Sequence, residues 1–186
     1  GEPVVLIDTA GIRRRGRVEQ GVEKYSVMRA LRAVQRADVV ALVIDASQGL
    51  TAQDTHVASY ALDEWKGMVL LVNKWDLVEK DSNTMNEYTR SLRAELKFID
   101  YVPMLFISAL TRQRVQKVIP LAQQVQNERS TRIPTSTLNK LVQDAAVKHR
   151  APSKTGKQLR IYYASQVDVQ PPTFMFFVND VELVHF

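Results

Sequence analysis

The chain has 186 residues, 45% of them hydrophobic and 24% charged, which is the balance of an ordinary folded protein rather than a disordered one. It has no cysteine, which excludes disulfides, thiolate metal sites and cysteine catalysis, and its scattered histidines, His56, His149 and His185, argue against a zinc site. No apolar run approaches the roughly 20 residues of a membrane span, and no basic-then-apolar leader opens the sequence, so we expect a cytoplasmic protein with no membrane partner.

In chain order, the first part alternates predicted strands with predicted helices. Strands are expected at Val4–Ile7, Val39–Ile44, Met68–Val72 and Met104–Ile107, and helices at about 23–37, 51–65, 84–97 and 115–128. Such alternation favours βαβ units and a parallel sheet that is buried on both faces. Ligands bind at the carboxyl ends of the strands in sheets of this kind. Three polar motifs directly follow three of the expected strands, so they are the candidates for a binding site.

The pattern changes after Arg129. A polar connector leads to Pro134, which is placed to open a new helix with an apolar stripe. A loop is expected over 151–157, and two strand-like runs follow at Leu159–Val169 and Thr173–Val178. We therefore divide the chain into a first domain over residues 1–129 and a second over residues 130–186.

The net charge of +5 is unevenly distributed. Eight lysines and arginines but only two acids lie between Glu128 and Val167, and an arginine-rich cluster spans residues 13–17. Basic stretches favour a polyanionic partner such as nucleic acid, because binding releases counterions. A solvated surface is the other interpretation, and the sequence leaves both open.

The first motif, Asp8-Thr9-Ala10-Gly11, follows the first expected strand. An aspartate at a strand end can hold a hydrated magnesium ion, and a glycine three residues later can bring its N–H against a terminal phosphate. The alternative is a plain strand-to-loop turn with a capping aspartate. Alone, this motif is too common to decide between the two.

The second motif is Asn73-Lys74-Trp75-Asp76. The Asp76 carboxylate can accept hydrogen bonds from the N1–H and the exocyclic amine of guanine, whereas adenine offers an acceptor at N1 and has no amine on the neighbouring carbon. The Asn73 amide can bond the base N7 and tie neighbouring loops, and the Lys74 stem can cover the base. An ordinary polar loop is the alternative.

The third motif, Ser108-Ala109-Leu110, follows the last strand of the first domain. Its small residues would let a backbone N–H reach the guanine O6. Each motif is weak or moderate alone, but their order at successive strand ends is specific and indicates a guanine-nucleotide-binding domain.

These motifs resemble the third, fourth and fifth signature elements of the translation-factor class of GTPases, over Val4 to about Glu128. The GxxxxGK(S/T) phosphate loop and the switch I threonine of that class are absent, and Gly11–Val18 imitates only the loop's glycine spacing. Ile12 stands where Ras-like proteins carry a catalytic glutamine. In some members with an aliphatic residue there, a potassium ion supplies the missing charge, so the resemblance makes potassium possible and leaves the catalytic residue unknown.

Longer stretches narrow the resemblance. Residues 8–17, 21–26 and 72–77 closely resemble the second G domain of the Der (EngA) family of bacterial ribosome-assembly GTPases, which carry tandem G domains and a C-terminal KH-like domain. Residues 160–164 and 176–180 resemble the start of that KH-like domain. The implied fold class is α/β, a doubly wound P-loop-GTPase-type sheet without its N-terminal strands and phosphate loop, followed by a partial α+β KH-like domain.

The resemblance also implies a function. The parent protein would bind GTP or GDP with magnesium, hydrolyse GTP, and act in assembly of the large ribosomal subunit through ribosomal RNA, while this chain alone would be inactive. Asp8, Thr9, Ala10 and Gly11 would serve magnesium and phosphate, and the guanine pocket would comprise Asn73, Lys74, Asp76, Ser108, Ala109 and Leu110.

The second domain leaves one choice open. It has no GxxG, so the usual KH clamp on RNA is absent, and the resemblance implies packing against the other G domain of the parent. Leu159, Ile161 and Tyr163, which alternate with Arg160 and Tyr162, are expected to form core and packing faces rather than a base-stacking platform. The alternative function is an RNA- or ribosome-binding module acting through this basic segment, including Lys154, Lys157 and Arg160.

Overall fold

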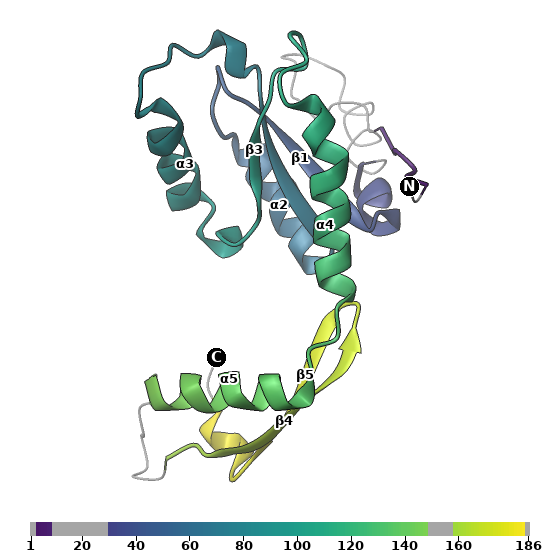
Figure 1. Cartoon of the computed structure of the whole chain (residues 1–186), viewed down its shortest axis with the longest axis vertical. Coiled ribbons are helices and arrows are strands. Elements are labelled where there is room, and N and C mark those ends of the chain that lie inside the picture. Colours follow the sequence, from purple (N-terminus) through teal and green to yellow (C-terminus); the bar gives the residue numbers. More distant parts are fainter. Residues whose placement is uncertain (1–2, 9–29, 149–157, 185–186) are drawn as a thin grey trace. The chain divides into compact units, whose positions relative to one another are not determined.

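The computed structural model describes residues 3–8, 30–148 and 158–184 of the chain (Figure 1). The chain divides into two compact units, Gly1–Gln126 and Asn127–Phe186. Each is described by itself below. Among the helices of the described part, none combines the length and the apolar character that crossing a bilayer requires.

The first unit is built on a three-stranded parallel sheet. Its strands β1 (Val39–Asp45), β2 (Gly67–Asn73) and β3 (Met104–Phe106) lie in the order β1-β2-β3. Helix α2 (Ala52–Asp63) connects β1 to β2, α3 (Thr84–Glu95) connects β2 to β3, and α4 (Val118–Ser130) follows β3 (Figure 1). The predicted α/β class with a parallel sheet is confirmed.

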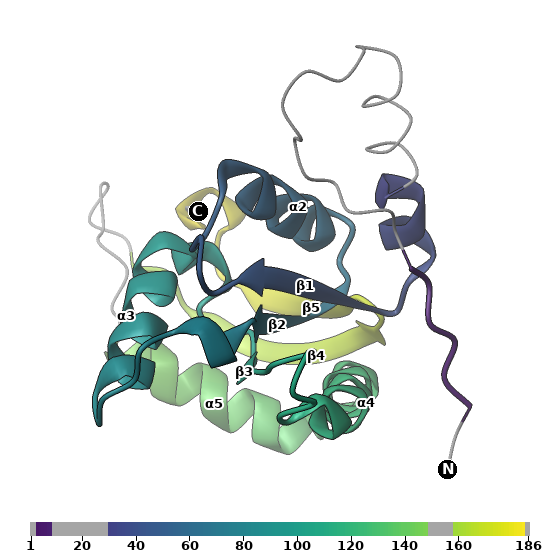
Figure 2. The same ribbon diagram turned by 90° about the horizontal axis from the view of Figure 1, so that it is seen from above.

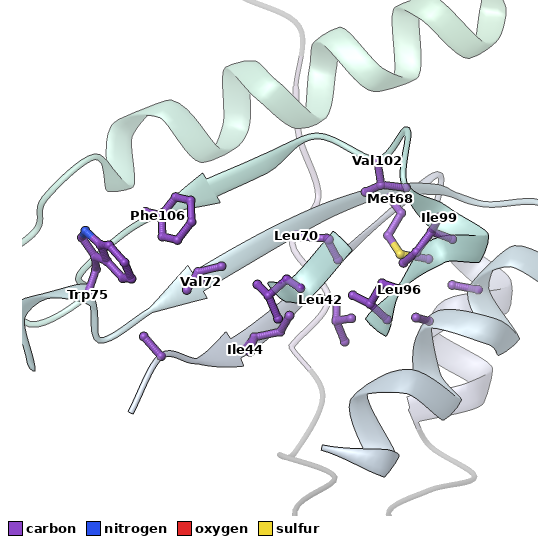
Figure 3. Close-up of a cluster of buried hydrophobic side chains, with 14 of the residues drawn as sticks. Leu42, Ile44, Met68, Leu70, Val72, Trp75, Leu96, Ile99, Val102 and Phe106 are labelled. Carbon is purple, nitrogen blue, oxygen red and sulfur yellow. The ribbon is translucent and has the colours of Figure 1, made fainter. Parts of the chain in front are cut away.

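Both faces of the sheet are covered, which explains why β2 is apolar at six successive positions before Asn73. Figure 2 shows α2 and α4 on opposite sides of the strands. One core cluster joins alternate strand residues to α2 and α3, and it is drawn in Figure 3. Its central members are Leu42, Ile44, Leu70, Val72, Ala58, Ala61 and Leu92. A second, smaller cluster places Val69, Leu71 and Ile107 against α4.

The N-terminal segment differs from the prediction. Residues 3–8 have no secondary structure, and Val5 and Leu6 are 84% and 78% exposed, so the strand expected at Val4–Ile7 is wrong. A strand needs a neighbour to satisfy its backbone hydrogen bonds. In the described residues, the sheet consists of β1, β2 and β3, and none of them pairs with this segment. The next predicted helix, at about 23–37, is described and helical over 30–36.

The second unit packs one helix on a hairpin. Helix α5 (Thr135–Lys148) lies against β4 (Ile161–Val169), which pairs antiparallel with β5 (Pro172–Val178). The Asn139 side chain on α5 accepts from the Ala164 N–H and donates to the Ala164 carbonyl, both at 2.8 Å. Gln143 donates to the Ile161 carbonyl at 2.9 Å. These amides satisfy backbone groups of β4 that α5 covers.

The alternation expected at the start of β4 is interrupted. The pairing with β5 shifts between Ile161 and Tyr163, so the side chains no longer simply alternate between faces. Tyr162 and Tyr163 are both exposed, at 64% and 45%, and the Tyr163 ring packs against Phe177 with centroids 5.7 Å apart. Ala164, rather than Tyr163, is the buried residue here.

Candidate guanine-nucleotide site

The candidate site lies where the three parallel strands end. Asp45 is the last residue of β1, and its register partner Asn73 is the last residue of β2. The backbone continues this pairing, because the Ala46 N–H donates to the Asn73 carbonyl at 2.8 Å. Ser108 follows β3 at the same edge, and Ile107 still bonds to Val72. The register therefore gathers side chains from distant parts of the sequence.

Asn73 ties the second motif to the third. Its side-chain Oδ1 accepts a hydrogen bond from the Ala109 N–H at 3.0 Å. The Nδ2 group of the same amide is the end that can donate to a base N7. The expected loop-tying contact is thus present, and it occupies the Ala109 N–H. A guanine O6 would therefore take this N–H from Asn73 or use the next one, that of Leu110.

Trp75 anchors the turn from below. It is 2% exposed, and its backbone N–H donates to the Ile107 carbonyl at 3.1 Å. The centroid of its ring lies 4.4 Å from that of Phe106 and 5.4 Å from that of Tyr88. Figure 3 shows Trp75 and Phe106 together at one end of the core cluster. The turn that carries Asp76 is therefore fixed to the hydrophobic core.

Asp76 holds a buried carboxylate oxygen without a partner. It lies in the short 3₁₀ turn Trp75–Leu77, and its Oδ1 is the one buried side-chain oxygen or nitrogen in the described residues that makes no hydrogen bond. Leaving such a group unsatisfied costs about 1–3 kcal/mol, and more for a charged group. A site that tolerates this cost has an acceptor ready for ligand donors.

Lys74 forms an ion pair with Asp45. Its Nζ lies 2.7 Å from Oδ2 of Asp45, whose side chain is 2% exposed, while the lysine side chain is 45% exposed. Oδ1 of Asp45 accepts from the Ser47 N–H at 3.0 Å and from its hydroxyl at 2.7 Å. The buried carboxylate thus has a partner on both oxygens, which is what burying a charge requires.

The charge of Asp45 is held in its ionised form. Burial raises the pKa of this carboxyl, but the hydrogen bonds from Lys74 and Ser47 and the attraction of the ammonium outweigh burial, so the pKa lies well below its usual range. The pKa of the neighbouring Tyr88 shifts in the opposite direction. Burial, and then the negative charge of Asp45, raise the pKa of its hydroxyl, which donates to the Ala46 carbonyl at 3.1 Å.

Lys74 also has an unfavourable backbone. Its φ of 61° and ψ of 32° are left-handed, a conformation that costs a residue with a Cβ roughly 1–2 kcal/mol. Such strain persists where the surroundings over-determine it, and it concentrates at functional sites. Here the ion pair with Asp45, the Asn73 contact and the burial of Trp75 all hold the turn in place.

The loop after β3 is closed by its own hydrogen bonds. Ser108 is fully buried, its N–H donates to the Gln113 carbonyl at 3.2 Å, and its Oγ accepts from the Thr111 N–H at 3.1 Å. Ala109 and Leu110 are exposed, the latter by 85%. The backbone of Ala109 lies beside Asn73 and donates its N–H to the Asn73 side chain; the contact with guanine O6 expected from the third motif stays a prediction.

The first motif is only partly within the described residues. Asp8 is exposed and lies outside the sheet, and Thr9, Ala10 and Gly11, like the arginine-rich cluster over 13–17, fall outside the described residues. A carboxylate with access to solvent suits a magnesium ion that keeps its water shell. Within residues 3–8, 30–148 and 158–184, no group of three or more His, Cys, Asp or Glu could hold a metal alone.

Two contributors to the site are absent from the three motifs. Asp45, at the end of β1, pairs with Lys74, and Ser47, in the loop after β1, orients the Asp45 carboxylate. Trp75 lies within the second motif and anchors its turn to the core. The signal for Asp45 is present in the sequence, because it is a charged residue at the end of an apolar strand run, as Asp8 was expected to be. Its contact with Lys74 depends on strand register, which a local pattern does not contain.

The fold and the order of these motifs define a class, the GTP-binding domains built on a parallel α/β sheet. The family described as the elongation factor Tu GTP binding domain matches residues 21–155, and the KH-domain-like family of EngA bacterial GTPase enzymes, C-terminal, matches residues 132–186. Solved structures agree in fold. A probable GTP-binding protein engB has a TM-score of 0.52 at 18% identity, over 65% of this chain and 77% of that one. The structure of Era in complex with MgGDPNP and part of 16S ribosomal RNA has a TM-score of 0.53 at 17% identity, over 92% of this chain and 59% of that one.

Curated relatives narrow the class. GTPase Der of Alkaliphilus oremlandii is 51% identical over 98% of this chain, and that of Leuconostoc citreum is 48% identical over all of it. The chain therefore belongs to the GTPase Der (EngA) family. It spans 41% and 43% of the length of these two relatives.

The ion pair between Lys74 and the buried Asp45 gives a pH-dependent prediction. Because the pKa of Asp45 is lower in the folded than in the unfolded chain, its ionised carboxylate stabilises the fold above the usual aspartate pKa, and this stabilisation is lost as the pH falls. We expect Asp45→Asn to lower the free energy of unfolding by about 1–3 kcal/mol at neutral pH, with a smaller difference in acid. Urea titrations followed by Trp75 fluorescence, with Trp65→Phe as the common background, measure this.

The matched control is Asp63→Asn, which removes the same charge from the exposed last residue of α2. It should change stability little at any pH. A loss in Asp45→Asn that does not vary with pH would show that the ionised pair is not its cause.

Proposed function

We propose that this chain carries the guanine-recognition part of a GTPase that hydrolyses GTP in its full-length form. The observation that carries the proposal is Asp76, whose buried oxygen has no partner at the carboxyl edge of a parallel sheet. A carboxylate there accepts from two adjacent N–H groups, and guanine presents such a pair at N1 and the exocyclic amine. Adenine has an acceptor at N1, so it would face the carboxylate with repulsion.

The surrounding residues have complementary roles in this proposal. Asn73 Nδ2 would donate to the base N7, and the Lys74 stem would cover the base plane. Ser108 would hold the loop through its bonds to Thr111 and Gln113, so that the N–H of Ala109 or Leu110 reaches O6. All of these groups lie at one edge of the sheet, as a ligand bound at the strand ends requires.

The phosphates, at the other end of the nucleotide from the base, need a different set of residues. We propose that Asp8 holds magnesium through water and that Gly11 meets the terminal phosphate, with Thr9 and Ala10 between them. The sequence contains no GxxxxGK(S/T) loop, whose N–H groups and lysine supply most phosphate binding. Turnover would therefore need residues of the longer protein. Ile12 cannot orient a water, so an accessory cation such as potassium would suit that protein.

The proposed setting is ribosome biogenesis. Residues 1–129 would be the partial G domain and residues 130–186 the start of the KH-like domain. The nucleotide state would control docking on a large-subunit precursor through ribosomal RNA, with the KH-like part packed on the other G domain of the parent. Support comes from the Der relatives and from the excess of basic residues between Glu128 and Val167.

Exchanging the base tests the role of Asp76. Asp76→Asn replaces an acceptor by an amide that also donates, so it suits xanthine, which has a carbonyl where guanine has its amine. We expect GDP binding to weaken by about 1–3 kcal/mol and xanthosine diphosphate binding to strengthen. Competition titrations with both nucleotides measure the exchange, with Asp63→Asn as control.

If Asp76→Asn loses GDP and gains nothing from the xanthine nucleotide, Asp76 acts on the fold and not on the base. Equal GDP binding by the variant and the wild type would remove Asp76 from the pocket altogether.

A second function, RNA contact through the second unit, is favoured by exposed basic residues. Lys140, Lys148 and Arg160 are exposed within a segment that matches the KH-like family. If they meet phosphates, ribosomal RNA affinity should fall steeply with salt, and Lys148→Gln with Arg160→Gln should reduce the salt slope by about one per charge removed. Filter binding across a salt series tests this. An affinity that changes neither with salt concentration nor with the two substitutions would reject RNA contact by this unit.

A further inference from the structure

Asp45 is a buried charge that none of the three motifs contains. Its side chain is 2% exposed, yet it receives the Lys74 ammonium at 2.7 Å and two hydrogen bonds from Ser47. Holding an ionised group in the interior is unfavourable unless its partners are fixed. A structural role in β1 alone therefore does not explain why an ionised carboxylate is buried at this position.

The loop after β1 fixes the direction of this carboxylate. The Ser47 N–H and hydroxyl both bond Oδ1, while the N–H groups of Gln48 and Gly49 bond the Asp45 carbonyl at 3.1 and 2.9 Å. Gly49 has a φ of +74°, a conformation that glycine adopts without strain. Oδ1 and the main chain are thus committed to the turn, and Oδ2 is left as a fixed acceptor for Lys74.

This acceptor determines where the Lys74 side chain runs. Lys74 follows the end of β2, and its ammonium is held at the end of the neighbouring strand, roughly 4.8 Å away across the sheet. Its methylene stem must therefore cross the carboxyl edge between β1 and β2. The same contact is one of the restraints on the left-handed turn that leads into Asp76.

We infer that Asp45 is a positioning residue of the guanine pocket, which acts by fixing Lys74 across the strand edge and so keeps the lysine stem and the Asp76 carboxylate set for the base. The inference rests on the proposed function and adds to it a residue on β1. Asp45 itself does not touch the ligand. The competing account is an ion pair that stabilises the fold and leaves the pocket unchanged.

A double-mutant cycle separates these accounts. Asp45→Asn, Lys74→Met and the double variant are compared with the wild-type chain for GDP and ADP affinity, with Trp65→Phe as the common background so that the buried Trp75 reports alone. If Asp45 acts through Lys74, Asp45→Asn should weaken GDP binding about tenfold, and the double variant should be no weaker than Lys74→Met. Asp63→Asn should bind like wild type.

Additive losses in the double variant would overturn the inference, because they mean that Asp45 acts independently of Lys74. So would wild-type GDP affinity in a folded Asp45→Asn. If Asp45→Asn does not fold, Ser47→Ala provides the milder test, since it removes one of the hydrogen bonds that orient the carboxylate. We expect it to weaken GDP binding about twofold to threefold, and unchanged affinity would overturn the inference.

Different results would contradict the guanine pocket and the positioning role of Asp45. A wild-type chain that binds GDP and ADP equally overturns the guanine pocket and this inference with it. A wild-type chain that selects GDP while Asp45→Asn selects it equally well overturns the positioning role alone.

Discussion

The parallel register that places Asp45 opposite Asn73 is the constraint on which the site depends. Strands that run in the same direction end at the same edge, so side chains about thirty residues apart in sequence become neighbours. Packing supports this register, because a shift of one residue would exchange Leu70 and Val72, which pack with α2 and α3, for Val69 and Leu71, which pack against α4. The packing of the core therefore also determines the geometry of the site.

Two carboxylate groups at this edge, the buried Asp45 and the partly buried Asp76, differ in their hydrogen bonding. Asp45 is satisfied inside the protein by Lys74 and Ser47, whereas Asp76 keeps one buried oxygen without a partner. The first arrangement gives rigidity, and the second leaves an acceptor that a ligand can satisfy. Because Trp75 joins the turn to the core, the cost of the unsatisfied oxygen is met by packing elsewhere in the unit.

Local sequence patterns predicted the parts of this structure that local forces determine. The apolar run before Asn73 indicated a buried strand, and its polar ending indicated a site at the strand end. The contact between Asp45 and Lys74 was not predictable in this way, since it depends on register. The strand expected at Val4–Ile7 failed because apolar residues alone do not supply a pairing neighbour, and the exposure of Tyr163 follows from a pairing shift with β5.

The central claim, a guanine-selective pocket at this edge, is tested most directly by backbone amide NMR of the chain titrated with GDP and, separately, with ADP. The account predicts shifts at Asp76, Ala109 and Leu110 and in the Asn73 side-chain amide with GDP, and none of comparable size with ADP. The same shifts with both nucleotides would contradict guanine recognition by Asp76. So would GDP shifts confined to other regions of the chain.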